Sequence, residues 1–488
     1  MFHSLYLLSP SSLFLHLLLS SSLLSSSNIR QSKITSLNQG SPPDRTQTDS
    51  ALISWNHGVT HGVVLFGGLN GGLDSGKILD DFWLYTIDSE GTSWTDVPSW
   101  LVPGPSKRYG HTLTNVGFDS SFVVLFGGAN ATLPYDSTYA GVTGDTWLLT
   151  ADNQLGPVRW SQPLMEEDIL HVTGAKTTKP SARYLHAMAS MAPKGKNTNS
   201  TKTISAVMFG GCSDLNCDTL LDDAWIFSGE RYYDPSSGNV IFKAAQWNLI
   251  TPPKTNTKPS ARRSHAMSYL GSAVGRILLF GGACGHGAGA KVDPCSDTDG
   301  TGTGNGITWE LQECSIVDPC SDNDGTGIGN EKEYQWVQIS KSKMSSNVEW
   351  PLPRHCSSMA ALTDGSTTEE NGFTALVLGG VDGTGNQNNV FKSTWTYGAL
   401  PGTGNYRTWK QHLPAATPAK RAMTTMAHLP GTENAILFGG SLAVQGKNNN
   451  DCPNSLDGMF LYCFFFKSKQ LSQQYRIISL TFSKLILF

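Results

Sequence analysis

Three histidines recur at a fixed distance from an arginine and are the first candidates for chemistry in this chain. His111, His186 and His265 each lie three residues after an arginine, within KRYGH, ARYLH and ARRSH. Neutral imidazole is the commonest metal ligand in proteins, so three of them could share one ion. Because ligands on successive repeats would lie far apart, we interpret these histidines as structural groups that hydrogen-bond to the backbone.

One loop has the residue spacing of a calcium site. Asp322, Asp324 and Glu333 occupy positions 1, 3 and 12 of an EF-hand-like loop, with Gly327 at position 6. Carboxylate oxygens around a glycine turn suit Ca²⁺. Position 5 holds Thr326, however, and no helical pattern flanks the loop. We therefore interpret it as a polar, disulfide-bearing loop and expect no cofactor, with Ca²⁺ as the alternative.

The nine cysteines are clustered in a way that favours disulfides. Cys212 and Cys217 enclose four residues, which suits a bond that staples one loop. Four more crowd a Gly/Asp-rich insert at about 283–333, with connectivity that the spacing leaves open: Cys284, Cys295, Cys314 and Cys320. No pair has the CxxC spacing of a zinc site. We expect an oxidising compartment, with free thiols in a cytoplasmic protein as the alternative.

The two ends of the chain differ in composition from the rest. Residues 1–27 combine an apolar stretch with small serines, which is typical of a cleaved secretory signal peptide, although no Lys or Arg precedes the apolar stretch. Residues 28–41 predict a flexible linker, and 466–488 form an atypical C-terminal tail. We expect a protein that is secreted or in the endomembrane lumen, without a membrane span. There Asn130 and Asn199, each in an Asn-x-Thr sequon, would accept N-glycans.

Composition favours a turn-rich β protein. The chain has 51 glycines and 13 tryptophans, and only 15% of its residues are charged. Its net charge of −4 is spread without long runs of one sign. A basic surface for nucleic acid is therefore not indicated.

A six-fold internal repeat organises most of the sequence. Each copy has an apolar strand that ends in two glycines, and successive copies lie 60 to 98 residues apart. The pairs are Gly67 and Gly68, Gly127 and Gly128, Gly210 and Gly211, Gly281 and Gly282, Gly379 and Gly380, and Gly439 and Gly440. An Arg-led segment precedes each pair, and an aromatic strand such as DDFWLY or DTWLL follows it. A further Trp then opens a fourth short strand in the first five copies, so each unit predicts four strands.

This order of Arg, Gly-Gly strand, aromatic strand and isolated Trp resembles the kelch repeat over residues 42–465. The resemblance implies an all-β fold, a six-bladed kelch-type β-propeller with four antiparallel strands per blade, in the superfamily of the galactose oxidase central domain. The glycines would then turn the second strand where a Cβ would clash. The tryptophans would pack between blades, and the arginines would donate hydrogen bonds between blades.

The sixth copy lacks a Trp-led fourth strand, so the last blade is expected to be incomplete. Either residues 475–482 stand in as its outer strand, or the C-terminus is foreign to the fold. We favour the second alternative.

Three functions are compatible with such a propeller. The preferred one is a non-catalytic module that binds a protein or glycan partner through its loops. A copper radical oxidase needs two histidines, a tyrosine and a Tyr–Cys cross-link at one metal, and a further C-terminal domain. Neither HGVTH at 57–61 nor the pair His355–Cys356 comes with a matching tyrosine. An iron-dependent kelch specifier protein needs Glu-x3-Asp-x3-His, a spacing that this sequence lacks. We therefore expect no enzymatic activity.

The loops suggest which face of the ring binds a partner. In a four-stranded antiparallel blade, the loops after strands 2 and 4 emerge on one face, here named the 2–3/4–1 face. Tyr135, Tyr139 and Leu170 lie in long segments on that face and are residue types that can anchor a partner. The opposite face carries residues 194–202, with a sequon and polar residues. The 2–3/4–1 face is therefore the predicted recognition surface.

Overall fold

A computed structural model gives the arrangement of the repeats. It describes residues 40–55, 60–71, 76–88, 91–99, 103–116, 121–131, 141–151, 158–163, 165, 179–191, 203–234, 239–251, 258–270, 276–284, 295, 308–313, 334–339, 350–362, 374–382, 390–398, 408–412, 420–429, 434–441, 459–465 and 476–478.

The described residues form six antiparallel sheets, each made of four strands that are consecutive in sequence. Blade 1 contains β1 (Asp49–Trp55), β2 (Thr60–Asn70), β3 (Lys77–Asp88) and β4 (Gly91–Val97). Blade 2 contains β5 (Thr112–Val116), β6 (Phe122–Ala129), β7 (Val142–Thr150) and β8 (Arg159–Ser161). Blade 3 contains β9 (Ala187–Met191), β10 (Thr203–Phe209), β11 (Ala224–Asp234) and β12 (Asn239–Ile250).

The second half of the chain repeats this plan. Blade 4 contains β13 (Ala266–Tyr269), β14 (Arg276–Phe280), β15 (Thr308–Glu313) and β16 (Tyr334–Ile339). Blade 5 contains β17 (Ser358–Leu362), β18 (Thr374–Leu378), β19 (Thr394–Gly398) and β20 (Thr408–His412). Blade 6 contains β21 (Thr425–Leu429), β22 (Asn434–Phe438), β23 (Met459–Phe465) and β24 (Arg476–Ile478). Five blades are clear and the sixth is partial.

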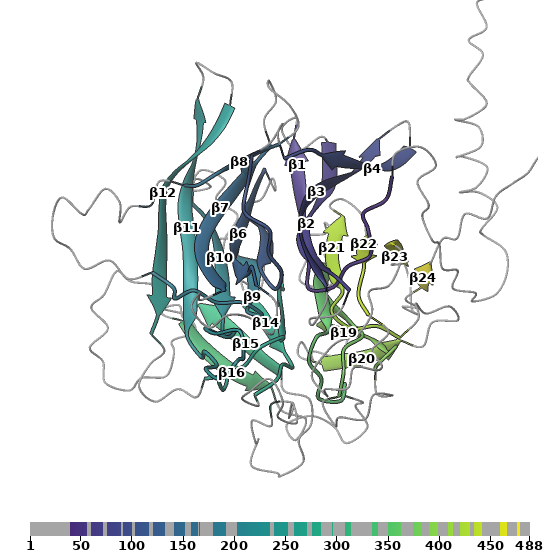
Figure 1. The fold of residues 1–488 in the computed structure, drawn as a ribbon. Helices are drawn as coiled ribbons and strands as arrows, with labels where there is room; N and C mark the ends of the chain where they lie inside the picture. Colours follow the sequence, from purple (N-terminus) through teal and green to yellow (C-terminus); the bar gives the residue numbers. More distant parts are fainter. Residues whose placement is uncertain are drawn as a thin grey trace, which may run out of the picture.

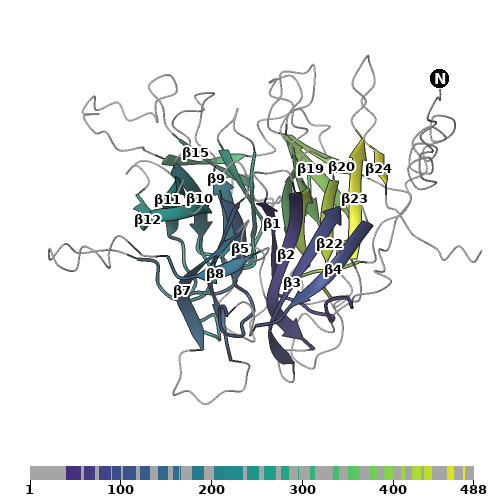
Figure 2. The same ribbon diagram turned by 90° about the horizontal axis from the view of Figure 1, so that it is seen from above.

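The blades close into a ring around their first strands. Strand β1 contacts β5 on one side and β21 on the other, and the contacts continue from β5 to β9, β13, β17 and back to β21. Figures 1 and 2 show the sheets arranged around a common centre, with β12 and β24 among the outer strands. The predicted all-β propeller of four-stranded antiparallel blades is therefore confirmed.

The outer strand of the sixth blade comes from the atypical C-terminal tail. Strand β24 pairs with β23, in the register Cys463 to Ile478 and Phe465 to Arg476. These residues belong to the segment 475–482 that could stand in as the outer strand. For β24 the structure thus follows the less favoured alternative, in which residues from 475–482 stand in as the outer strand. Even a short extended segment can pair with the free backbone groups at the edge of β23.

The second strand of each blade is mostly apolar because both of its faces are covered by neighbouring blades. In β6 all eight residues, Phe122–Ala129, are buried. The aromatic side chains provide much of the packing between blades. The ring of Trp160 in blade 2 lies 5.7 Å from that of Phe66 in blade 1, and Trp336 in blade 4 lies 5.2 Å from Phe209 in blade 3. The prediction that tryptophans pack between blades is confirmed.

The paired glycines bring neighbouring blades together through their backbones. All twelve have positive φ, for example +67° at Gly210 and +99° at Gly211. A Cβ on Gly210 would lie 2.6 Å from the carbonyl oxygen of Arg262 in the next blade. That oxygen accepts a hydrogen bond of 2.9 Å from Gly211 N. The expected close approach is confirmed, and it explains why an apolar strand ends in two residues without side chains.

A second backbone feature lines the inner ends of the blades and was not predicted. The residue two positions after each repeat arginine is left-handed, with φ between 51° and 62°. These residues, here called the αL ring, are Gln47, Gly110, Leu185, Ser264, Cys356 and Met423. The backbone N–H groups of the last five each donate to the carbonyl of the ring residue in the preceding blade, over 2.8 to 2.9 Å. Five of the six carry side chains, so their strained backbone is set by the ring and not by local sequence.

Candidate functional site

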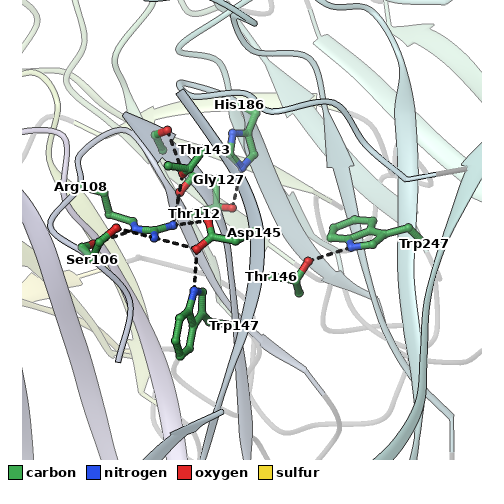
Figure 3. Close-up of polar contacts among 11 residues, drawn as sticks. Ser106, Arg108, Thr112, Gly127, Thr143, Asp145, Thr146, Trp147, His186 and Trp247 are labelled. Carbon is green, nitrogen blue, oxygen red and sulfur yellow. Dashed lines mark hydrogen bonds and ion pairs between the residues drawn. The ribbon is translucent and has the colours of Figure 1, made fainter. Parts of the chain in front are cut away.

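Each of the first three blades contains a buried ion pair that connects strands 1 and 3. In blade 2 (Figure 3), Arg108 donates from Nη1 to Asp145 Oδ1 over 2.7 Å and from Nη2 to Asp145 Oδ2 over 2.9 Å. Nη1 also donates to the carbonyl of Gly127 over 2.9 Å. The indole Nε1 of Trp147 donates to Asp145 Oδ2 over 2.7 Å. The same network joins Arg45, Asp81 and Trp83 in blade 1 and Arg183, Asp223 and Trp225 in blade 3.

These arginines correct one prediction. Their guanidinium groups were expected to donate hydrogen bonds between blades, but Arg108 bonds to Asp145 and Gly127 of its own blade. The contact between blades is made by its backbone carbonyl, which accepts a hydrogen bond of 2.8 Å from Gly68 N in blade 1. The guanidinium stays within the blade because the aspartate that begins strand 3 lies within its reach.

Removing Asp145 is expected to destabilise the protein. Burial alone would raise its pKa, but the hydrogen bonds and charge of Arg108 and the indole of Trp147 hold the pKa below its ordinary value. Asp145→Ala would leave Arg108, which is 1% exposed, without its counter-charge. We expect a loss of about 2 kcal/mol in the free energy of unfolding, below the range for fully buried pairs because Asp145 is 32% exposed.

Urea unfolding measures this effect. Asp222→Ala is the matched control, because Asp222 is 48% exposed and pairs with the exposed Lys258. Asp222→Ala should lower the free energy of unfolding by less than about 0.5 kcal/mol. Equal losses in the two variants would contradict a special role for the buried pair.

The three repeated histidines lie between blades. His111, His186 and His265 each place the imidazole 5.6 Å from the phenyl ring that ends strand 2 of the preceding blade. His186 Nε2 also hydrogen-bonds Thr112 Oγ1 over 2.9 Å. Burial, reinforced by the nearby arginines, lowers the pKa of His111 and His265 to about 3 and that of His186 well below its ordinary value. Neutral histidines packed edge-on against phenyl rings fit the structural interpretation.

A buried carboxylate at the inner end of blade 1 connects three blades. Asp49 Oδ2 accepts a hydrogen bond of 2.7 Å from the backbone N–H of Leu113 in blade 2. Asp49 Oδ1 accepts one of 2.9 Å from the hydroxyl of Thr425 in blade 6 and one of 2.8 Å from Ser50 N. Burial raises the pKa of Asp49 to about 6, although these hydrogen bonds act in the opposite direction. No motif in the sequence distinguishes this aspartate from the others.

A pocket of about 310 Å³ opens between blades 3 and 4 on the 2–3/4–1 face. Its walls come from the start of strand 3, the end of strand 4 and the following loop in blade 3, and from Trp336 in blade 4. Leu249 contributes an apolar side chain that is 44% exposed. Lys258 Nζ lies 2.7 Å from Asp222 Oδ2 on the same wall.

The pocket arises where one blade lacks a hydroxyl that others have. Between blades 2 and 3, Trp247 Nε1 donates to Thr146 Oγ1 over 3.1 Å (Figure 3). Between blades 4 and 5, Trp409 Nε1 donates to Thr308 Oγ1 over 2.9 Å. Between blades 3 and 4 the equivalent residue, the one after the aspartate, is Ala224. The smaller side chain leaves space beside the tryptophan of the next blade.

The comparisons with known proteins find similar solved structures but no family. No protein-family model matches the sequence, and no curated protein matches it significantly. Among solved structures, one described as the structure of YjhT is 11% identical, with a TM-score of 0.44, and the match covers 88% of this chain and 97% of the other. AofleA from Arthrobotrys oligospora is 10% identical, with a TM-score of 0.37, and the match covers 93% and 95%. The ring of blades with its repeated glycine pairs and Arg–Asp–Trp networks decides the assignment. The chain is a β-propeller of four-stranded antiparallel blades.

Two disulfides staple loops of the propeller. The predicted bond between Cys212 and Cys217 is present, and a second joins Cys284 to Cys295 in the insert. Together they indicate an oxidising compartment. Cys314 and Cys320 lie outside the described residues. Of the cysteines that the structure describes with their side chains, Cys356 is buried and outside the two disulfides, with His355 Nδ1 3.0 Å from its Sγ.

Most of the other predicted site residues lie outside the described part of the propeller. This holds for the recognition residues Tyr135, Tyr139 and Leu170, the calcium-loop residues Asp322, Asp324 and Glu333, and the sequon residue Asn199. Asn130 is described and exposed, as an N-glycan acceptor requires. Within the described ranges, no three His, Cys, Asp or Glu side chains gather as metal ligands would. The same ranges hold no helix that is long and apolar enough to cross a membrane.

Proposed function

We propose that this propeller is a non-catalytic interaction module that binds a protein or glycan partner through its 2–3/4–1 face. The observation that carries the proposal is the pocket between blades 3 and 4, which opens on that face. A rigid ring that presents loops and a preformed pocket is suited to binding, because little conformational entropy is lost when the partner docks.

The pocket combines the two kinds of contact that such a partner needs. Leu249, which is 44% exposed, offers apolar surface against which a sugar ring or an apolar side chain can pack, whereas Trp336 is 2% exposed and only closes the pocket from within. The exposed pair of Lys258 and Asp222 offers a donor and an acceptor for orientation. The long segments that carry Tyr135, Tyr139 and Leu170 belong to the same face by the order of the strands, and we propose that they extend the surface.

The compartment follows from the same proposal. We propose that the protein is secreted or resides in the endomembrane lumen, with residues 1–27 removed as a signal peptide and N-glycans on Asn130 and Asn199. The two disulfides support this location, because cytosolic thiols stay reduced. Expression through a secretory pathway should give a product that starts near residue 28 and is sensitive to glycosidase. An intact N-terminus on an unglycosylated protein would contradict the location.

Substitutions in the pocket test the binding proposal. Leu249→Asp and Lys258→Glu should each weaken capture of ligands from an oligosaccharide array or a peptide display library at least about tenfold, the effect of losing one central contact. Both side chains are exposed, so the thermal melt should change little. Tyr135→Ala with Tyr139→Ala tests the neighbouring loop in the same assay.

Tyr232 provides the matched control. It is 42% exposed and lies near the other end of β11, at the hairpin between strands 3 and 4 and therefore on the opposite face. Tyr232→Ala should leave capture unchanged. Loss of capture in this variant, with full binding by the pocket variants, would place recognition on the opposite face.

A further inference from the structure

Blade 5 lacks the carboxylate that the first three blades place between an arginine and a tryptophan. Asp81, Asp145 and Asp223 each lie two residues before the tryptophan of strand 3. In blade 5 the same position is Ser393, two residues before Trp395. The hydroxyl of Ser393 accepts a hydrogen bond of 3.0 Å from Arg354 Nη1, so the arginine still reaches this position.

The donors that would bind the missing carboxylate are still present. Arg354 is 1% exposed, and it donates from Nε to Leu352 O and from Nη1 to Gly379 O. Its Nη2 makes no hydrogen bond to a residue that the structure describes. Nε1 of Trp395 is buried and likewise has no partner among them. In blades 1–3 the equivalent two nitrogens share one carboxylate oxygen, over 2.6 to 2.9 Å.

A second substitution removes the other partner of Nη2. In blades 2, 3 and 4 this nitrogen also donates to the hydroxyl of a serine two residues before the arginine, over 3.0 to 3.1 Å: Ser106, Ser181 and Ser260. Blade 5 has Leu352 there, with a side chain that is 61% exposed. Two independent changes therefore leave the same guanidinium nitrogen without a partner among the described residues, and a buried cation without a counter-charge there is costly.

The place where the other blades hold the aspartate carboxylate is close to solvent. The aspartate side chains that fill it in the first three blades are 25%, 32% and 28% exposed. Phe391 places its ring 4.0 Å from the guanidinium carbon of Arg354 and so packs against one face of the planar group. The edge of the guanidinium, where a carboxylate binds with two parallel hydrogen bonds, is not used by this contact.

We propose that blade 5 binds an external carboxylate in place of the missing aspartate, held by Arg354 Nη2, the hydroxyl of Ser393 and Trp395 Nε1. The occupant is a carboxylate on a methylene group, because the aspartate side chain that the other blades place here has that shape. Acetate, whose methyl group stands in for the methylene, is a small mimic of such a ligand, and the aspartyl side chain of a partner protein presents the methylene carboxylate itself. This anion site is separate from the pocket between blades 3 and 4.

Acetate titration of the thermal melt tests the site. At constant ionic strength set with the bulkier benzenesulfonate, the midpoint should rise and saturate with millimolar acetate, since a ligand that binds only the folded state stabilises it. Ser393→Asp supplies the carboxylate within the chain. It should raise the midpoint without acetate and abolish the response to acetate. An equal response in the wild type and in Ser393→Asp would overturn the proposal.

Two further variants keep the test decisive if Ser393→Asp folds poorly. Trp395→Phe removes one donor and keeps the ring, so the acetate dissociation constant should rise at least about fivefold, the effect of losing one hydrogen bond. Asp223→Ser creates the blade 5 arrangement in blade 3, and its lowered midpoint should be partly restored by acetate. An indole N–H resonance of Trp395 that does not move with acetate would also overturn the site.

Competition experiments identify the source of the carboxylate. A pocket variant separates this site from the proposed function. An aspartate-containing peptide should compete with acetate, whereas glucuronate, with its carboxylate directly on a ring, should not. Competition by glucuronate alone would overturn the methylene-carboxylate assignment. Leu249→Asp should keep the full acetate response, so failure of the pocket proposal and failure of this one give different results.

Discussion

Lowering the pH from about 7 to about 5 is expected to destabilise this propeller by about 4 kcal/mol. The cause is the set of buried histidines between blades. The pKa of His111 and of His265 is lowered to about 3 in the folded protein, and that of His186 is also lowered. Below pH 6.5 the unfolded chain binds protons at these positions while the folded protein does not, so stability is lost as the pH falls towards 3.

Two carboxylates oppose this trend. Because the folded pKa of Asp49 is raised to about 6, the folded protein binds a proton there more tightly than the unfolded chain. Asp49 therefore makes folding more favourable as the pH falls from about 6 to about 4. Burial also raises the pKa of Asp96, which acts in the same direction as Asp49. Burial lowers the pKa of His412 to about 4 and lowers that of His61, which adds to the effect of the three histidines, so the net change has the sign of the histidines.

Urea unfolding at a series of pH values measures the slope. Replacing His111, His186 and His265 together with glutamine should flatten it between about pH 6.5 and 5, even if the variant is less stable at pH 7. A slope that survives the triple substitution would mean that other groups cause the acid sensitivity.

Gly210→Ala is expected to cost about 3 kcal/mol of stability. A residue with a Cβ is strained by about 1–2 kcal/mol at the φ of +67° found here. The new Cβ would also lie 2.6 Å from Arg262 O, and moving that oxygen would disturb its hydrogen bond with Gly211 N. The loss therefore combines local strain with a weaker contact between blades 3 and 4.

The free energy of unfolding in urea again gives the measurement. Gly62→Ala in β2 is the control, because the φ of Gly62 lies outside the left-handed region. An alanine there should be tolerated far better, as it restricts the unfolded chain without clashing with a neighbouring blade. If both variants lose the same stability, the close approach at Gly210 is not the cause.

The fold was predictable because its determinants repeat in the sequence. The glycine pair after an apolar strand, the aromatic third strand and the isolated Trp each occur in several copies, so six sheets in a ring could be expected. The disulfide between Cys212 and Cys217 was predictable for a different reason, since short spacing limits its alternatives. The αL ring was not predictable from the sequence, because its residues share a backbone conformation and no side-chain type.

The candidate sites were less predictable because they depend on contacts between distant residues. Asp145 was recognised only as the acidic residue that leads a strand, and its partner Arg108 lies 37 positions away. The pocket depends on Ala224, where blades 2, 4 and 5 have a threonine, and the anion site depends on Ser393. A small residue at a position where other blades have a larger one forms no sequence motif. Its role is visible only when equivalent positions of the folded blades are compared.

The contiguity of the blades has a consequence for the order of folding. Every sheet is made of four consecutive strands, so no strand is shared between the first and the last blade. The ring is closed between them by contacts such as the 2.7 Å hydrogen bond of Ser50 with Thr425, which spans 375 positions, and Gly440 N to Arg45 O. Hairpins within a blade join residues that are close in sequence and can form early, whereas this junction requires the largest loss of chain entropy. We therefore expect the junction of blades 6 and 1 to form last during folding and its amides to exchange with solvent first.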